Sequence, residues 1–230
     1  MGLLAAATVG ALILLPQAAT APAAELKVIA AAPMTAVIRD IGTLFERDTV
    51  HKLISKFVPT PAVKREVDAG ETFDLVVAGT SGIDELIKEG KIKDSTRAAV
   101  AFAGVGMGVR AGAPKPDISS VDAVKRTLLN AKSVAHSAEG ASVAIFRGLL
   151  ERIGISEEMK PKLKPLVGTG LQSFVNSEAE IVVLFIPTIV GAPGVELVGP
   201  FPSELQTYIT FAGGVTTRAK EPVGAQALIT

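Results

Sequence analysis

Five short segments combine hydroxyl side chains with glycine, alanine and proline, and each follows an apolar stretch. The segments are 31–35, 60–62, 79–81, 136–142 and 168–170. They contain no Asp, Arg or Lys, and Glu139 is their one acid. Where such a segment precedes a helix, backbone N–H groups of the first turn bind anions without a cationic side chain. The candidate ligand-binding residues are Pro33, Met34, Thr35, Thr60, Pro61, Gly79, Thr80, Ser137, Gly140, Ala141, Ser142 and Gly170. Alternatively, each hydroxyl only caps a helix or a turn, positions that Ser and Thr favour.

His136 is the residue in these segments that is suited to move a proton. It follows an apolar run and stands beside Ser137 and Glu139. Imidazole is the commonest general acid or base near neutral pH. His136 and Glu139 are therefore the catalytic candidates if the protein is an enzyme, and a hydrogen-bonded loop histidine is the alternative for His136. The second histidine, His51, opens a predicted strand and is interpreted as structural.

The composition excludes several other kinds of site. The 230 residues include no Cys, which rules out disulfides, thiolate metal sites and cysteine nucleophiles. The 23 Lys and Arg balance 23 Asp and Glu, so the chain lacks the excess of positive charge that is typical of nucleic-acid-binding proteins. The glycine run 104–108 is not a dinucleotide fingerprint, and 168–170 lacks the lysine of a P-loop. We expect no metal, no cofactor and no nucleic-acid partner.

The elements that must position these segments alternate between short apolar runs and helix-period stretches. Strands are predicted over 26–30, 51–57, 73–78, 100–109, 133–136, 180–186, 195–198 and 205–211. Helices are predicted from Thr35 onward and over 62–69, 83–89, 121–131, 142–153 and 171–176. Successive strand–turn–helix units predict an α/β fold with mostly parallel sheets and flanking helices. Small ligands of such sheets bind at the carboxyl ends of the strands.

The first 24 residues have the character of a secretory signal peptide. They carry no charged side chain, and a run of apolar residues from Leu3 to Leu15 is followed by small residues. That run is shorter than the ~20 residues that span a bilayer. Cleavage after Ala23 fits the small-residue preference, although no Lys or Arg precedes the apolar run. A buried N-terminal helix is the alternative. We predict that residues 1–23 are removed on export.

Several stretches of the remaining chain resemble the molybdate-binding proteins of bacterial ABC importers. These are Leu26–Ala32, Phe45–Arg47, Val67–Ala78, Ile83–Lys91, Arg110–Ser119 and Pro193–Gln206. The resemblance implies the type II periplasmic binding-protein fold, with two lobes, two hinge crossovers and a cleft that closes on an oxyanion. Pro33 stands where that family has a serine, and Phe185 falls near its tyrosine. One branch of the family is an aconitate isomerase, so the resemblance leaves an enzyme open.

The sequence thus predicts the extracytoplasmic receptor of an ABC importer. Lobe one is expected over 24–106 with 206–230, and lobe two over 107–205. The expected ligand is a small oxyanion of the molybdate or tungstate type, or a small organic anion. The expected partner is a membrane permease, and the receptor is expected to be a periplasmic monomer. The alternative is an isomerase of a small polycarboxylate on the same fold.

Overall fold

Lobe one is built on four strands whose apolar runs lie in a single sheet. The computed structural model describes residues 24–166, 171–176 and 179–230. The strands are β1 (Ala24–Ala31), β2 (His51–Val58), β3 (Leu75–Gly79) and β9 (Tyr208–Val215). Their order is β2-β1-β3-β9, with the first three parallel and β9 antiparallel to β3. The predicted signal peptide and the glycine turn at 168–170 lie outside the described residues.

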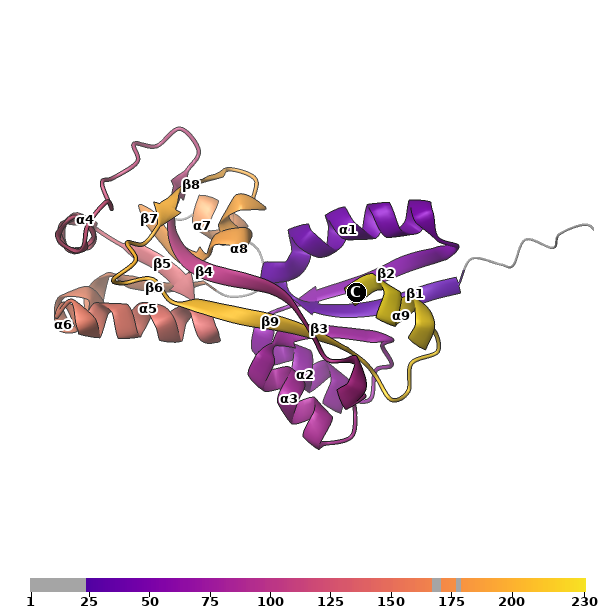
Figure 1. Ribbon diagram of the computed structural model, residues 1–230. Helices are drawn as coiled ribbons and strands as arrows, with labels where there is room; N and C mark the ends of the chain where they lie inside the picture. The colour runs from indigo at the N-terminus through magenta and orange to yellow at the C-terminus, as the bar shows by residue number, and fades with distance from the viewer. Residues whose placement is uncertain (1–23, 167–170, 177–178) are drawn as a thin grey trace, which may run out of the picture.

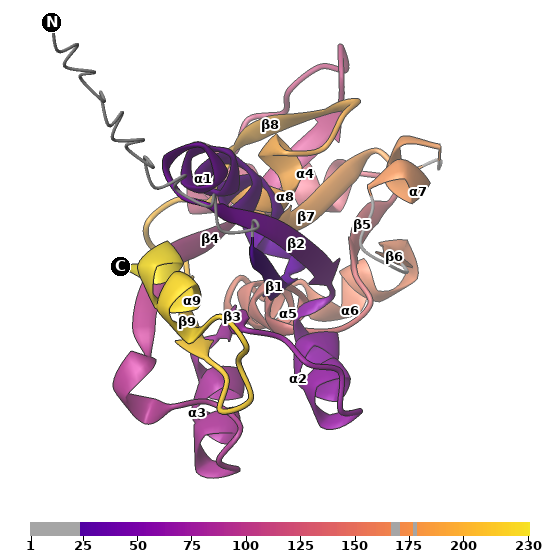
Figure 2. The same ribbon diagram turned by 90° about the vertical axis from the view of Figure 1, so that its right-hand side faces the viewer.

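Helices cover both faces of this sheet. They are η1 (Ala32–Met34, a 3-10 turn), α1 (Thr35–Asp48), α2 (Thr60–Asp68), α3 (Thr80–Lys88), the 3-10 turn η2 (Asp94–Thr96) and α9 (Pro222–Ile229). Helix α1 lies on one side of the strands, and α2 and α3 lie on the other (Figure 2). Gly70 and Gly90 end α2 and α3 with positive φ angles of 92° and 69°, a conformation that favours glycine.

Lobe two repeats the same plan with shorter elements. Its strands are β5 (Val134–Ser137), β6 (Leu163–Leu166), β7 (Ile181–Phe185) and β8 (Val195–Pro200), and β7-β5-β6 are parallel. Its helices are α4 (Val121–Asn130), α5 (Ala141–Arg152), α6 (Ser156–Met159), the 3-10 turn η3 (Lys160–Lys162), α7 (Gln172–Val175) and α8 (Ile186–Val190). The mostly parallel α/β architecture predicted from the sequence is confirmed.

A single long strand, β4 (Ala98–Arg110), belongs to both lobes. Residues 98–104 pair antiparallel with β9, whereas 105–110 pair with β7 and β8. Figure 1 shows β4 and β9 running side by side from one lobe to the other. The second crossover is the segment 201–207 between β8 and β9.

The glycine run in β4 lets β8 and α8 pack closely against this strand. A Cβ atom on Gly106 would lie 2.8 Å from the Gly199 carbonyl oxygen and 2.8 Å from Cγ1 of Ile186. Such distances are shorter than packed atoms tolerate, so a side chain here would push β8 and α8 away from β4. This packing accounts for glycine at 106 without a bound dinucleotide.

Several elements differ from the sequence prediction. The stretch 159–165 is rich in Pro and Lys and was not predicted as a strand, but β6 begins within it as an edge strand, where Pro165 is tolerated. The strand predicted over 205–211 is β9 and begins at Tyr208 instead, because Leu205 and Gln206 both donate backbone hydrogen bonds to the Pro202 carbonyl in a turn. Helix α8 was not predicted.

Within the described part of the chain, no helix is both long and apolar enough to cross a membrane.

Candidate functional site

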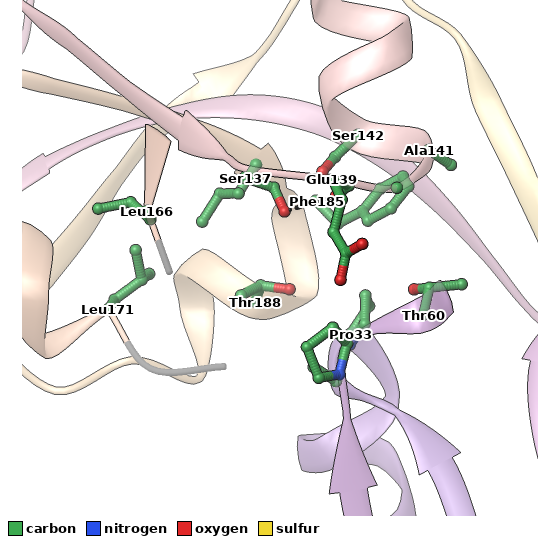
Figure 3. A pocket seen from close by; sticks show the side chains of 14 residues that line it. Pro33, Thr60, Ser137, Glu139, Ala141, Ser142, Leu166, Leu171, Phe185 and Thr188 are labelled. Atoms are coloured by element: carbon green, nitrogen blue, oxygen red, sulfur yellow. Dashed lines mark hydrogen bonds between the residues drawn. The ribbon is translucent and has the colours of Figure 1, made fainter. Parts of the chain in front are cut away.

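A small pocket lies between the lobes at the carboxyl ends of their strands (Figure 3). Its volume is about 60 Å³, where one water needs about 10–15 Å³. Lobe one contributes the end of β1 and the start of α2, and lobe two contributes the β5–α5 loop and the β7–α8 junction. The lining residues are Ala32, Pro33, Pro59, Thr60, Ser137, Glu139, Gly140, Ala141, Ser142, Leu166, Leu171, Leu184, Phe185 and Thr188.

The amino end of α5 supplies uncapped backbone donors to this pocket. Its N-cap is Gly140, which has no side chain that could accept a hydrogen bond from the first turn. The first N–H groups of a helix have no acceptor within the helix, and they carry the positive end of its dipole. Gly140 has a φ of 95°, and a Cβ there would lie 3.5 Å from Cδ of Pro61 in lobe one. The positive φ favours glycine at this turn, and a Cβ there would only reach ordinary contact distance from lobe one.

Hydroxyl groups from both lobes converge on the same space. Ser142 is only 5% exposed and lines the pocket from the first turn of α5. The hydroxyls of Thr60 and Thr188 point into the same pocket from α2 and α8 (Figure 3). The Ser137 hydroxyl instead donates to the Glu139 carbonyl at 2.7 Å. A hydroxyl can both donate and accept, so Thr60, Ser142 and Thr188 offer neutral hydrogen-bond donors to a ligand or water in the pocket.

Cationic side chains near the pocket are engaged elsewhere. Arg65 of α2 pairs with the Glu139 carboxylate across the lobes at 3.4 Å. Lys64 donates to Asp68 at 2.8 Å and contacts Glu89 at 2.7 Å. The hydrogen bond with Asp68 is the main cause that raises the pKa of Lys64 above its ordinary value, followed by the one with Glu89. The pocket itself therefore offers neutral donors, and such a set binds an anion through hydrogen bonds and helix dipoles.

A family model for bacterial extracellular solute-binding proteins matches residues 26–230. The chain belongs to this family. A molybdate-binding protein, ModA, from Azotobacter vinelandii is 32% identical over 148 residues, which are 64% of this chain and 58% of that relative. The resemblance to molybdate-binding proteins predicted from the sequence is thereby confirmed.

A second relative of this solute-binding protein is an enzyme. An aconitate isomerase from a Pseudomonas species is 29% identical over 228 residues, which are 96% of this chain and 87% of that one. Among solved structures, the periplasmic molybdate-binding protein of Azotobacter vinelandii superposes with a TM-score of 0.73. That match covers 89% of this chain and 90% of the other at 14% identity, so it shows the shared fold alone.

The pocket of this solute-binding protein brings together about half of the residues proposed from the sequence. Those that line it are Pro33, Thr60, Ser137, Gly140, Ala141 and Ser142, together with Glu139. Pro61 and Gly79 line an adjoining groove of about 280 Å³ that shares Thr60 and Gly140 with the pocket. Thr35 lines a second adjoining groove, next to Thr188.

The remaining proposed residues are not part of the pocket. Met34 is 1% exposed and belongs to the hydrophobic core. Thr80 begins α3 and lines none of these three hollows. Gly170 lies outside the described residues. The strand ends thus lead to the loops that surround this pocket, but they do not indicate which way each side chain points.

His136 lies on the other face of the lobe-two sheet. It is 3% exposed, its ring packs against Phe146, and its Nδ1 atom is 2.6 Å from the Ser137 carbonyl oxygen. Burial is the main cause that lowers its pKa below the ordinary value, and the Arg147 charge adds to this effect. His136 lines a separate cavity with Arg147. The structure therefore does not bring His136 and Glu139 into one site.

The lobe-two wall beyond β7 was not predicted from the sequence. Thr188 lines the pocket from the short helix α8, which starts directly after a buried strand with Pro187 in its first turn. A hydroxyl just after an apolar run and a proline is a usable signal, because proline favours the first turn of a helix. Leu166 and Leu171 carry no such signal, since only the tertiary structure places them beside the pocket.

Proposed function

We propose that the protein is the receptor of an ABC importer, which binds a small anion between its lobes and delivers it to a membrane permease. The observation that carries this proposal is the interlobe pocket, where Ser142 at the start of α5 stands with the hydroxyls of Thr60 and Thr188. The proposal also draws on the solute-binding family to which the chain belongs. Export to the periplasm after removal of residues 1–23 is part of it.

The proposed ligand is a small oxyanion of the molybdate or tungstate type, or a small organic anion. One relative is named for molybdate and another for aconitate, and both compounds are anions. The neutral donors of Thr60, Ser142 and Thr188 suit either class. Helix amino ends contribute roughly 0.3–1 kcal/mol each toward an anion, and up to ~2 kcal/mol where partly buried.

Ligand binding is proposed to close lobe one (24–106 and 206–230) onto lobe two (107–205). Two lobes joined only by crossover strands move as rigid bodies about a few hinge residues. The proposed hinges are the parts of the two crossovers near Val105–Arg110 and Pro200–Gln206. The ion pair between Arg65 of lobe one and Glu139 of lobe two already joins the lobes at one edge of the cleft.

Calorimetry together with small-angle scattering tests this proposal. The protein is titrated with molybdate, tungstate, sulfate, phosphate, lactate and cis-aconitate, and its radius of gyration is measured with each ligand that binds. The expected result is saturable binding of at least one anion, accompanied by a smaller radius. Binding without compaction would contradict the closing cleft, and no binding of any of these anions would contradict the anion receptor.

An isomerase of a small polycarboxylate is the second candidate. It is favoured by the likeness to aconitate isomerase along 96% of the chain and by a carboxylate, Glu139, that lines the pocket. Among the described lining residues, however, no Lys or Arg is available to hold a tricarboxylate. The test is interconversion of cis- and trans-aconitate by the protein and by Glu139→Gln. Turnover that the substitution abolishes would replace the receptor proposal with this one.

A further inference from the structure

Glu139 is the one charged residue among the described residues that line the interlobe pocket. The other lining side chains are apolar or carry a hydroxyl. Figure 3 shows its carboxylate reaching from the β5–α5 loop toward Pro33 and Thr60 of lobe one. Because Glu139 lines this small pocket, a ligand bound there lies close to its carboxylate.

Of the two carboxylate oxygens of Glu139, only Oε1 contacts a cationic side chain in the described part of the chain. Its Oε1 atom lies 3.4 Å from Nη2 of Arg65, and no hydrogen bond to Oε2 is found in the described part of the chain. The Arg65 side chain is 62% exposed and does not line the pocket. Exposed ion pairs of this kind are weak because water screens them. The carboxylate therefore stays an anionic acceptor at the edge of the pocket.

An ionised carboxylate accepts hydrogen bonds and donates none. A fully ionised oxyanion such as sulfate or molybdate also has only acceptors, so it would face Glu139 with no proton between two negative groups. A ligand with its own O–H can instead donate to Glu139 in a charge-assisted hydrogen bond. Its remaining oxygens can then accept from Ser142 and from the first turn of α5.

We infer that Glu139 makes the pocket selective for anions that carry a hydrogen-bond donor of their own. Hydrogen phosphate and 2-hydroxycarboxylates belong to this class, whereas sulfate and molybdate do not. The inference rests on the proposed receptor function and narrows its ligand. The hydroxyl of Ser142 and the carboxylate of Glu139 then bind different parts of one molecule, an acceptor oxygen and a donor O–H.

The test compares the protein with Glu139→Gln, which keeps the side-chain length and replaces one acceptor oxygen with an N–H donor. Glu157→Gln is the matched control, because Glu157 lies on α6 with its side chain 79% exposed. Each protein is titrated calorimetrically at pH 8 and fixed ionic strength with sulfate, molybdate, inorganic phosphate and lactate. At this pH, phosphate and lactate keep an O–H, and sulfate and molybdate have none.

The unmodified protein is expected to bind phosphate or lactate at least tenfold more tightly than sulfate or molybdate. Glu139→Gln should reduce this preference at least fivefold, mainly through tighter binding of the fully ionised anions, whereas Glu157→Gln should keep it. Phosphate and lactate are separate arms that distinguish a phosphoryl ligand from a hydroxy acid. Equal or tighter binding of sulfate or molybdate by the unmodified protein, or an unchanged preference in Glu139→Gln, overturns the inference alone. Failure of both proteins to bind any of the four anions also overturns the inference, and only the further failure to bind tungstate and cis-aconitate overturns the receptor proposal as well.

Discussion

The side-chain amide of Gln206 binds both backbone groups of Val105. Its Nε2 atom donates to the Val105 carbonyl oxygen at 2.9 Å, and its Oε1 atom accepts from the Val105 N–H at 3.2 Å. Val105 is the residue at which β4 leaves β9 and begins to pair with β7. The amide of Gln206 thus replaces a strand partner where the two crossovers pass between the lobes.

Gln206→Ala should lower the free energy of unfolding by about 1–3 kcal/mol, because it leaves the Val105 N–H and carbonyl without their partner. Urea unfolding monitored by circular dichroism measures the change. Gln172→Ala is the control, since its amide makes an exposed hydrogen bond to Asn176 within one helix turn, where losses stay within about 0.5 kcal/mol. Equal changes in the free energy of unfolding for Gln206→Ala and Gln172→Ala would show that the Gln206 amide does not stabilise the crossover.

Ser142→Ala should weaken anion binding by roughly tenfold or more. A hydrogen bond to a charged group contributes about 1.5–3 kcal/mol, and 1.4 kcal/mol corresponds to a factor of ten. Calorimetric titration with the tightest-binding anion measures the loss. Ser95→Ala, an exposed serine far along the chain, should leave the affinity unchanged. An unaltered dissociation constant in Ser142→Ala would remove the start of α5 from the binding site.

Asp74→Asn should destabilise the protein by about 2–4 kcal/mol. The Asp74 carboxylate is 3% exposed and accepts backbone hydrogen bonds from Lys27 at 2.8 Å, Lys220 at 2.6 Å and Glu221 at 2.9 Å. An amide can accept on one atom only, so at least one buried N–H loses its acceptor and faces another donor. Denaturant unfolding measures the effect, and Asp122→Asn on the exposed surface of α4 should change stability by less than 0.5 kcal/mol. Similar denaturant midpoints for Asp74→Asn and Asp122→Asn would contradict a stabilising role of the Asp74 carboxylate.

Stability should fall below about pH 6.5 because of His136. Burial lowers the pKa of His136 in the folded protein, whereas the unfolded chain has the ordinary value of about 6.5. As the pH falls through that value, the unfolded chain takes up a proton that the folded protein does not, and the free energy of unfolding decreases. The contribution is fully present above pH 6.5, and its slope is at most about 1.4 kcal/mol per pH unit.

His136→Asn and His136→Phe remove the titrating ring, and the second keeps an aromatic contact with Phe146. Both variants should lose less stability between pH 7.5 and pH 5.5 than the unmodified protein does. Denaturant unfolding at the two pH values measures this difference. A loss of the same size in all three proteins would falsify a role for His136. The affinity for anions at pH 7.5 should change less than twofold, because His136 does not line the interlobe pocket.

The sequence by itself determined the α/β class, the order of most elements and several loops that surround the interlobe pocket. Apolar runs such as Leu75–Ala78 bury both faces of a parallel strand, and their character is visible without any partner. The glycines at 70, 90 and 140 likewise indicated turns, and all three adopt positive φ angles. Local chemistry is sufficient for these features because each depends on residues close together in the chain.

Only the tertiary structure decided which side chains share a pocket. His136 and Ser137 are neighbours in β5, but successive residues of a strand point to opposite faces, so one faces Phe146 and the other faces the cleft. Glu139 meets Arg65 across 74 positions of sequence, and Gln206 meets Val105 across 101. No period or motif records such contacts, because they depend on how the crossovers place one lobe against the other.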